Sequence, residues 1–204
     1  MNPGKGSHSL GNSRQKGSTR SRERMKKPKT KVRRQVDPKA LGWPSDSQAS
    51  SGFWCNHSYE DLRGLSWQEA RETLETERSL MLRINDSEDA VATMDEIADE
   101  FYEDPGLDPY GLDVGVASTV VALSALGCVP LSSCNGGCYG DFHHESYPLV
   151  VFCAKPMHVP DLIKAATTAD VDLENDADGM LIVHTDDIVR LSEFARALIG
   201  DHSM

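Results

Sequence analysis

Residues 113–133 read DVGVASTVVALSALGCVPLSS, and this stretch decides the fold that the chain is expected to adopt. Asp113 is a suitable N-cap and Gly127 a suitable C-terminal stop, so the stretch predicts a helix followed by a short strand at 128–133. Glycine, serine and proline limit the helix to about four turns, less than the roughly 20 apolar residues of a membrane span. We therefore expect a central helix that is buried between other elements.

The segments on either side complete an alternating pattern. Two amphipathic helices are expected first, at 66–84 and 86–104, and a Ser66–Glu69 capping box opens the former. After the central stretch we expect a buried strand, a helix, two short strands and a closing helix, at 147–154, 161–169, 171–173, 179–185 and 187–199. The pattern predicts an α+β fold: a small, largely antiparallel four-stranded sheet covered by helices, with the helix-strand-strand unit as a candidate repeat.

Charge is divided sharply between two parts of the chain. The 204 residues have a formal net charge of -11, but residues 1–40 hold thirteen Lys or Arg against Glu23 and Asp37. This segment is therefore +11, and residues 41–204 carry -22. The basic segment has too few apolar residues to offset the entropy cost of folding. The sequence thus predicts a disordered basic tail and linker over 1–52 and a single acidic α+β domain over 53–204.

The basic tail suggests one partner and leaves three alternatives open. Its cations can neutralise phosphates, so the tail 1–40 is a candidate contact for nucleic acid. The alternatives are a solubilising extension, a tail that folds back on the acidic domain, and a translation start at Met25 instead of Met1. The tail lacks an apolar secretory core and the five cysteines are an odd number, so we expect a soluble cytoplasmic protein with reduced thiols and no membrane partner.

A second feature is the stretch SSCNGGCYGDFHHESY, residues 132–147, which connects the two strands that follow the central helix. This connection is much longer than the ~2–5 residues of ordinary hairpin loops, and long loops in compact domains are often functional. Thiolate and imidazole groups are ligands that Zn2+ prefers, so the stretch predicts a zinc site. The candidate ligands are Cys134, Cys138 and His143 or His144, with Cys128 as a possible fourth.

The same stretch allows two other kinds of site. Cys134 is a candidate nucleophile with His143 or His144 as its base, which would make the protein a thiol-dependent enzyme. In a non-covalent ligand pocket, by contrast, the backbone N–H groups of the turn would face an anion. The residues of that pocket would be Cys134, Asn135, Gly136, Gly137 and His143. In the plainest interpretation, the thiols are core residues at strand ends and the histidines lie on a solvated loop tip.

The residues SSCNG, 132–136, resemble the Ser-Ser-Cys-x-Gly segment that follows a buried helix in the methyltransferase family that builds wybutosine in transfer RNA. That family has an arginine after the glycine, where this chain has Gly137. The resemblance covers five of 204 residues, and no family is assigned from it.

These observations lead to three hypotheses about function. The first is a small-ligand-binding or metal-binding domain that uses residues 132–147, with zinc as the candidate metal. The second is a non-enzymatic interaction module whose basic tail contacts nucleic acid or an acidic partner. The third is a thiol-dependent enzyme with Cys134 as its nucleophile.

Overall fold

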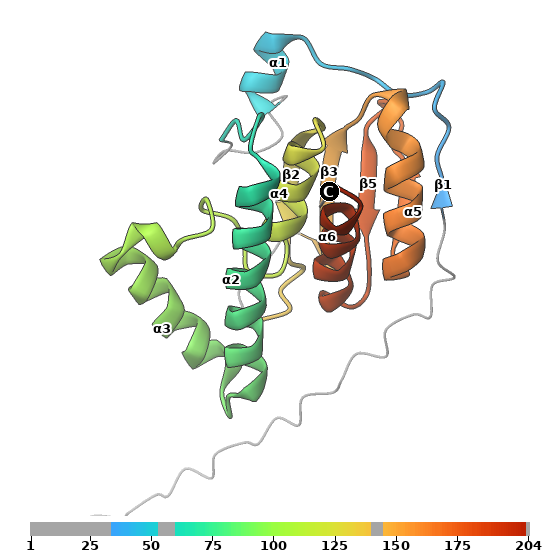
Figure 1. The fold of residues 1–204 in the computed structure, drawn as a ribbon. Coiled ribbons are helices and arrows are strands. Elements are labelled where there is room, and N and C mark those ends of the chain that lie inside the picture. The colour runs from blue at the N-terminus through green and yellow to red at the C-terminus, as the bar shows by residue number, and fades with distance from the viewer. Residues whose placement is uncertain (1–33, 53–59, 140–144, 203–204) are drawn as a thin grey trace, which may run out of the picture.

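A computed structural model describes residues 34–52, 60–139 and 145–202 of the chain (Figure 1). The elements in chain order are β1 (Arg34–Gln35), α1 (Asp46–Ser50), α2 (Trp67–Asp86), α3 (Ala90–Glu103), the short 3-10 helix η2 (Pro105–Leu107), α4 (Ala117–Ala125), β2 (Val129–Cys134), β3 (Leu149–Cys153), the 3-10 helix η3 (Pro156–His158), α5 (Val159–Ala169), β4 (Asp172–Asn175), β5 (Leu181–His184) and α6 (Val189–Asp201). Among the described residues, no helix combines the length and the apolar character that crossing a membrane would need.

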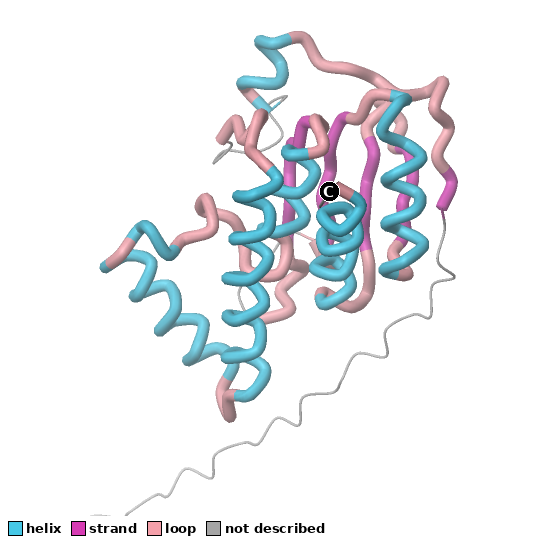
Figure 2. The backbone as a smooth tube through the Cα atoms, in the orientation of Figure 1, coloured by secondary structure: helices cyan, strands magenta, loops and turns pink. Residues whose placement is uncertain are grey.

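The sheet confirms the predicted α+β class. Its strands lie in the order β1-β4-β5-β3-β2, and the four longer strands form antiparallel pairs, while the two-residue β1 adds to β4 in parallel. Helices α4, α5 and α6 cover one face of these strands, and α2 lies beside α4 (Figures 1 and 2). The helix, strand, strand order occurs twice before α6 closes the fold, as the sequence predicts.

The main core lies between the sheet and its covering helices. Val150 and Phe152 of β3 point toward the helices and pack in the same cluster as Leu123 of α4 and Leu198 of α6. Every residue of α4 from Ala117 to Ser124 is buried, so this helix is the buried central helix that the sequence predicts. Burial on all sides explains why its sequence carries no charge.

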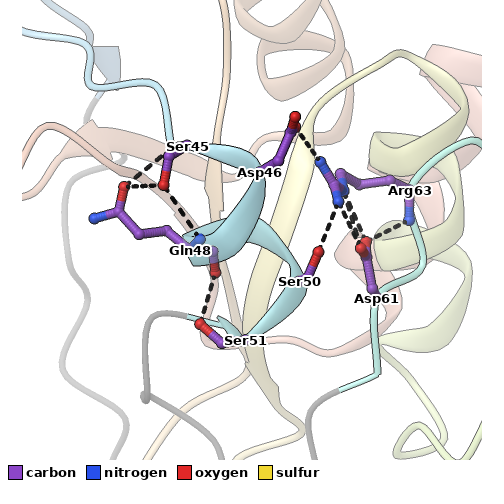
Figure 3. A network of polar contacts seen from close by, with 7 residues as sticks. All are labelled: Ser45, Asp46, Gln48, Ser50, Ser51, Asp61 and Arg63. Carbon is purple, nitrogen blue, oxygen red and sulfur yellow. Dashed lines mark hydrogen bonds and ion pairs between the residues drawn. The ribbon is translucent and has the colours of Figure 1, made fainter.

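Residues 45–52, which the sequence assigns to a linker, contain α1 instead. Ser45 caps this helix, and its hydroxyl and backbone are paired with Gln48 in a capping box (Figure 3). Ala49 is 1% exposed and packs in a small cluster with Cys153 of β3, on the face of the sheet away from the main core. The composition of this stretch, mostly small polar residues, is typical of a linker. A helix that buries only one alanine has no repeating apolar pattern by which the sequence could reveal it.

The start of α4 also differs from the prediction, since Asp113 is not its N-cap. The helix begins at Ala117, and Val116 precedes it without a side-chain cap. Gly115 has a backbone φ of +100°, which a helix cannot include, so the helix cannot extend back to Asp113. The N–H groups at this helix end that have no acceptor within the helix are satisfied by another part of the chain.

That partner is Glu77 of α2, whose side chain is fully buried beneath α4. Its Oε1 accepts a hydrogen bond from the N–H of Gly115 at 2.9 Å, and its Oε2 accepts one from the N–H of Ser118 at 3.3 Å. The hydroxyl groups of Ser118 and Ser192 also donate to Oε2. Burial raises the pKa of Glu77 more than these hydrogen bonds lower it. A carboxylate from α2 thus holds α4 and α6 together at this point.

Candidate ligand pocket at the edge of the sheet

A cavity of about 300 Å³ opens at the edge of the sheet that β2 forms. Its lining residues come from α4, β2 and the segments before α2 and α4, and they include apolar residues as well as residues with carboxyl, phenol and hydroxyl side chains. The lining residues are Glu60, Leu62, Tyr110, Gly111, Leu112, Asp113, Val120, Pro130, Leu131, Ser132 and Ser133. None of these described lining residues is Lys, Arg or His. The cavity therefore combines apolar walls with groups that bind polar or positively charged atoms.

Arg63 holds the wall that contains Glu60 and Leu62. Its guanidinium donates to both carboxylate oxygens of Asp61, with an Nη2–Oδ2 distance of 2.7 Å (Figure 3). The same group reaches Asp46 at 3.3 Å and the hydroxyl of Ser50 at 3.1 Å, both in α1. The hydrogen bond from the Arg63 side chain lowers the pKa of Asp61, against the effect of partial burial. Arg63 thus ties the chain before α2 to α1, and the hydroxyl of Ser124 in α4 donates to the Leu62 carbonyl on the other side.

A tight turn at Tyr110 and Gly111 forms the second wall. Both residues have positive φ angles, +63° and +66°, and the Gly111 N–H donates to the Asp108 carboxylate at 2.8 Å. A tyrosine in this left-handed region costs about 1–3 kcal/mol, so the surrounding structure must impose it. Burial raises the pKa of the Tyr110 phenol, and the negative charges of Glu69 and Glu72 raise it further. The phenol therefore lies in a half-buried, electrostatically negative environment.

The third wall leads from Ser132 and Ser133 directly into the turn that the sequence singles out. Asn135 is 4% exposed, and its backbone N–H donates to Oδ2 of Asp113 at 3.3 Å. Its side-chain amide reaches the Val114 carbonyl at 3.5 Å. The structure therefore brings the start of the predicted loop against the wall of the cavity.

The turn itself uses its glycine N–H groups internally. The Gly137 N–H donates to the side-chain oxygen of Asn135 at 3.0 Å, and the Gly136 N–H reaches the sulfur of Cys134 at 3.4 Å. Both glycines have positive φ angles, +66° and +69°. Binding an anion through these N–H groups would require them to exchange their present acceptors.

The predicted metal ligands are only partly described. Cys134 is half-buried and Cys138 is exposed, while His143 and His144 lie outside the described residues. Within the three described ranges, no group of three or more His, Cys, Asp or Glu residues could hold a metal ion. The zinc site therefore stays a prediction that depends on His143 and His144.

Cys128 cannot serve as a fourth ligand beside Cys134, which corrects one part of that prediction. The two cysteines lie at opposite ends of β2, and six residues of extended chain span about 20 Å. Zinc ligands must all lie about 2.3 Å from one ion. Cys128 instead packs in the main core, where burial raises the pKa of its thiol to about 12. Cys153 is also a buried core residue, as the sequence predicts.

The sequence does not anticipate a polar row on the other face of the sheet. His184 in β5 lies between two carboxylates of β4, with Nδ1 3.9 Å from Asp172 and Nε2 3.4 Å from Glu174. The ring of Tyr147 leans against the imidazole, with centroids 5.3 Å apart. Only the pairing of β5 with both β4 and β3 brings these residues together, so no sequence motif could have revealed them.

Cys134 belongs to the same cross-strand row but is separated from His184. Strand pairing places Cys134 opposite Leu149 and Leu149 opposite His184. Two strand spacings amount to about 10 Å, too far for a hydrogen bond between the thiol and this imidazole. A thiol-dependent enzyme would therefore need His143 or His144 as its base, and it stays a prediction.

Comparison with known proteins does not assign the chain to a family. No family model matches it, and neither the curated proteins nor the solved structures include one that is significantly similar.

Proposed function

We propose that this protein binds a small polar ligand in the cavity at the β2 edge, next to residues 132–147. The observation that carries the proposal is the hydrogen bond between Asp113 and Asn135, because it joins the cavity wall to that stretch. A ligand in the cavity would contact Asp113, Ser132 and Ser133, and it would influence the turn that begins at Cys134.

The construction of the cavity supports this proposal. Ligand sites are typically apolar clefts with a few polar groups, and their volumes begin at about 300 Å³. Leu62 and Val120 supply apolar walls here, while Asp113 and Ser133, which is paired with Val150 on the helix-covered face of the sheet, supply polar groups. The left-handed Tyr110 adds support, since backbone strain of this kind clusters at binding and catalytic sites.

A titration followed by NMR tests the proposal. A library of small amines, polyols and carboxylic acids is added to the ¹⁵N-labelled full chain, and the amide signals of Gly111, Ser132, Ser133 and Asn135 are monitored. We expect at least one compound to shift these signals in a saturable manner. Ser133→Tyr fills the cavity and should abolish the shifts, whereas Thr168→Tyr, on the exposed side of α5, should preserve them. Saturable shifts that survive Ser133→Tyr would overturn the proposal.

The metal and thiol alternatives use the same loop and need different tests. Elemental analysis of the purified full chain measures zinc directly, and a stoichiometric content that is lost in Cys134→Ala and His143→Ala would support the metal site. The thiol-dependent enzyme would be supported if a catalytic activity of the full chain were lost when an alkylating agent modifies Cys134 stoichiometrically. Neither result is needed for the small-ligand proposal.

An interaction module is the second candidate function, because of the +11 charge over residues 1–40. The structure alters how this idea should be tested. Arg34 and Gln35 pair with β4, and the Asp37 N–H donates to the Asn175 side chain at 2.7 Å. Deletion should therefore stop at residue 33, so that the sheet stays intact. Loss of salt-dependent binding to duplex DNA or RNA in that variant would support nucleic-acid contact by the tail.

A further inference from the structure

We infer that the pocket at the β2 edge selects ligands that carry a positively charged amine or guanidinium group. This inference rests on the small-ligand function proposed above and names the class of ligand. It is drawn from the charges on the cavity walls, the partners that those charges already have, and the absence of cations among the described lining residues.

Two carboxylates line the cavity from different walls. Glu60 is exposed at one wall, whereas Asp113 is half-buried at the wall that contacts the turn. Two more acidic residues of α2, Glu69 and Glu72, act on the phenol of Tyr110, which also lines the cavity. Negative charge therefore approaches the cavity from three segments that are separate in the sequence.

The described cation beside the Leu62 wall is already paired with other carboxylates. Arg63 lies next to the wall that contains Leu62, but its guanidinium is directed toward Asp61 and Asp46 (Figure 3). An anionic ligand would meet like charges here, while an ammonium group would meet carboxylate and hydroxyl oxygens.

The hydrogen-bonding groups have the matching polarity. An ammonium or guanidinium group only donates hydrogen bonds, and carboxylates only accept them. A hydroxyl group such as that of Ser133, which shares the helix-covered face of the sheet with Val150, accepts as well as donates. Hydrogen bonds between charged partners are roughly twice as strong as those between neutral ones. The cavity thus favours a small amine with a short apolar stem over a neutral or anionic compound of equal size.

Three probes of matched length test this selectivity: 1,4-diaminobutane, 1,4-butanediol and succinate. Each is titrated into the ¹⁵N-labelled full chain at low salt, and the amide signals of Gly111, Ser132 and Ser133 are followed. We expect saturable shifts with the diamine and at least about tenfold weaker binding of the diol and the diacid. Raising the salt concentration should weaken binding of the diamine, because added ions screen the carboxylates.

Two neutralising variants and one matched control complete the experiment. Asp113→Asn and Glu60→Gln should each weaken diamine binding, by about tenfold for Asp113 and less for the exposed Glu60. Asp178→Asn removes one charge in the β4–β5 turn, two strands away from β2, and should leave the affinity unchanged. If Asp113→Asn disturbs the turn that begins at Cys134, Glu60→Gln still tests the effect of removing a wall charge.

The outcomes distinguish failure of the charge selectivity from failure of the proposed small-ligand binding. If the diol or the diacid shifts the same amides as strongly as the diamine, the charge selectivity is overturned and the pocket function stands. If the diamine shifts no amide of the pocket, or if its affinity falls equally in Asp178→Asn, the inference is likewise overturned. The pocket function itself fails if no compound of the wider library binds there, or if saturable shifts survive Ser133→Tyr.

Discussion

Oδ2 of Asp113 accepts a hydrogen bond from the backbone N–H of Asn135 at 3.3 Å, across 22 residues of chain. Asn135 is buried, so removal of this acceptor leaves a buried donor unsatisfied. We expect Asp113→Ala to lower the free energy of unfolding by about 1–3 kcal/mol and Asp113→Asn, which keeps an acceptor oxygen, to lower it less. Urea denaturation measures both. Equal losses in the two variants would contradict this role for the carboxyl oxygen.

Glu77 should make the stability of the protein depend on pH. Because burial raises its pKa in the folded state, the folded chain binds more protons than the unfolded chain between the usual value of 4.5 and that raised pKa. The free energy of unfolding should therefore contain a contribution that falls as pH rises through this window. In Glu77→Gln that fall should disappear, although the variant loses an acceptor oxygen and is less stable at low pH.

Urea denaturation between pH 4.5 and 9 measures this slope. Glu75→Gln provides the matched control, since Glu75 is exposed on the same helix and its replacement should leave the slope unchanged. If the slopes of wild type and Glu77→Gln coincide, Glu77 has the same proton affinity in the folded and unfolded chain.

Alanine variants of two glycines with the same φ angle distinguish the cost of backbone strain from the cost of a steric clash. Gly111 and Gly136 both have φ of +66°, so alanine at either position pays about 1–2 kcal/mol for the left-handed conformation. A Cβ at Gly111 would meet nothing within 4 Å, whereas at Gly136 it would lie 2.4 Å from the carbonyl carbon of Tyr147. We expect Gly136→Ala to be less stable than Gly111→Ala by about 1–3 kcal/mol, as measured by thermal or urea unfolding. Similar losses would show that the turn can move away from Tyr147.

Arg63→Lys should weaken ligand binding because the cavity wall that contains Glu60 and Leu62 is then no longer held in place. Lysine keeps the charge but cannot bridge Asp61, Asp46 and Ser50 at once, so the Glu60–Leu62 wall loses its attachment to α1. We expect weaker binding of 1,4-diaminobutane in the NMR titration and only a small loss of stability, because the pairs are partly exposed.

Arg83→Lys is the matched control for that prediction. Arg83 makes a comparable pair of contacts, to Glu96 and Glu100, which join α2 to α3 and leave the cavity walls untouched. Its affinity for the diamine should equal that of the wild type. A similar loss of affinity in both variants would mean that arginine replacement acts through overall charge or stability.

Elements that depend on interactions between near neighbours in the sequence agree with the expectation. Elements that depend on contacts between distant residues differ from it. The Ser66–Glu69 capping box is present at the start of α2, because both partners lie within one turn of the same helix. The helix after Asp113 starts later than expected, because the positive φ angle of Gly115 is incompatible with a helix. The N–H groups at the helix end are instead capped by Glu77 from α2. For α1, one buried alanine stabilises a segment whose composition resembles a linker.

The candidate site was predictable only in part. Ser132, Ser133 and Asn135 lie within the stretch that the sequence singles out, and they border the cavity or its wall. Glu60 and Tyr110 were not predicted, because neither belongs to a motif and each reaches the cavity only through packing.

The sequence by itself determined the order of helices and strands from α2 to α6, the buried central helix and the division of charge between residues 1–40 and 41–204. These properties depend on residue type and local spacing, which the printed sequence contains. Only the tertiary structure decided which distant residues meet: Asp113 with Asn135, Glu77 with Gly115, and Arg63 with Asp46. These pairs are 22, 38 and 17 residues apart, and no local pattern specifies them, because packing of the whole chain brings their segments together.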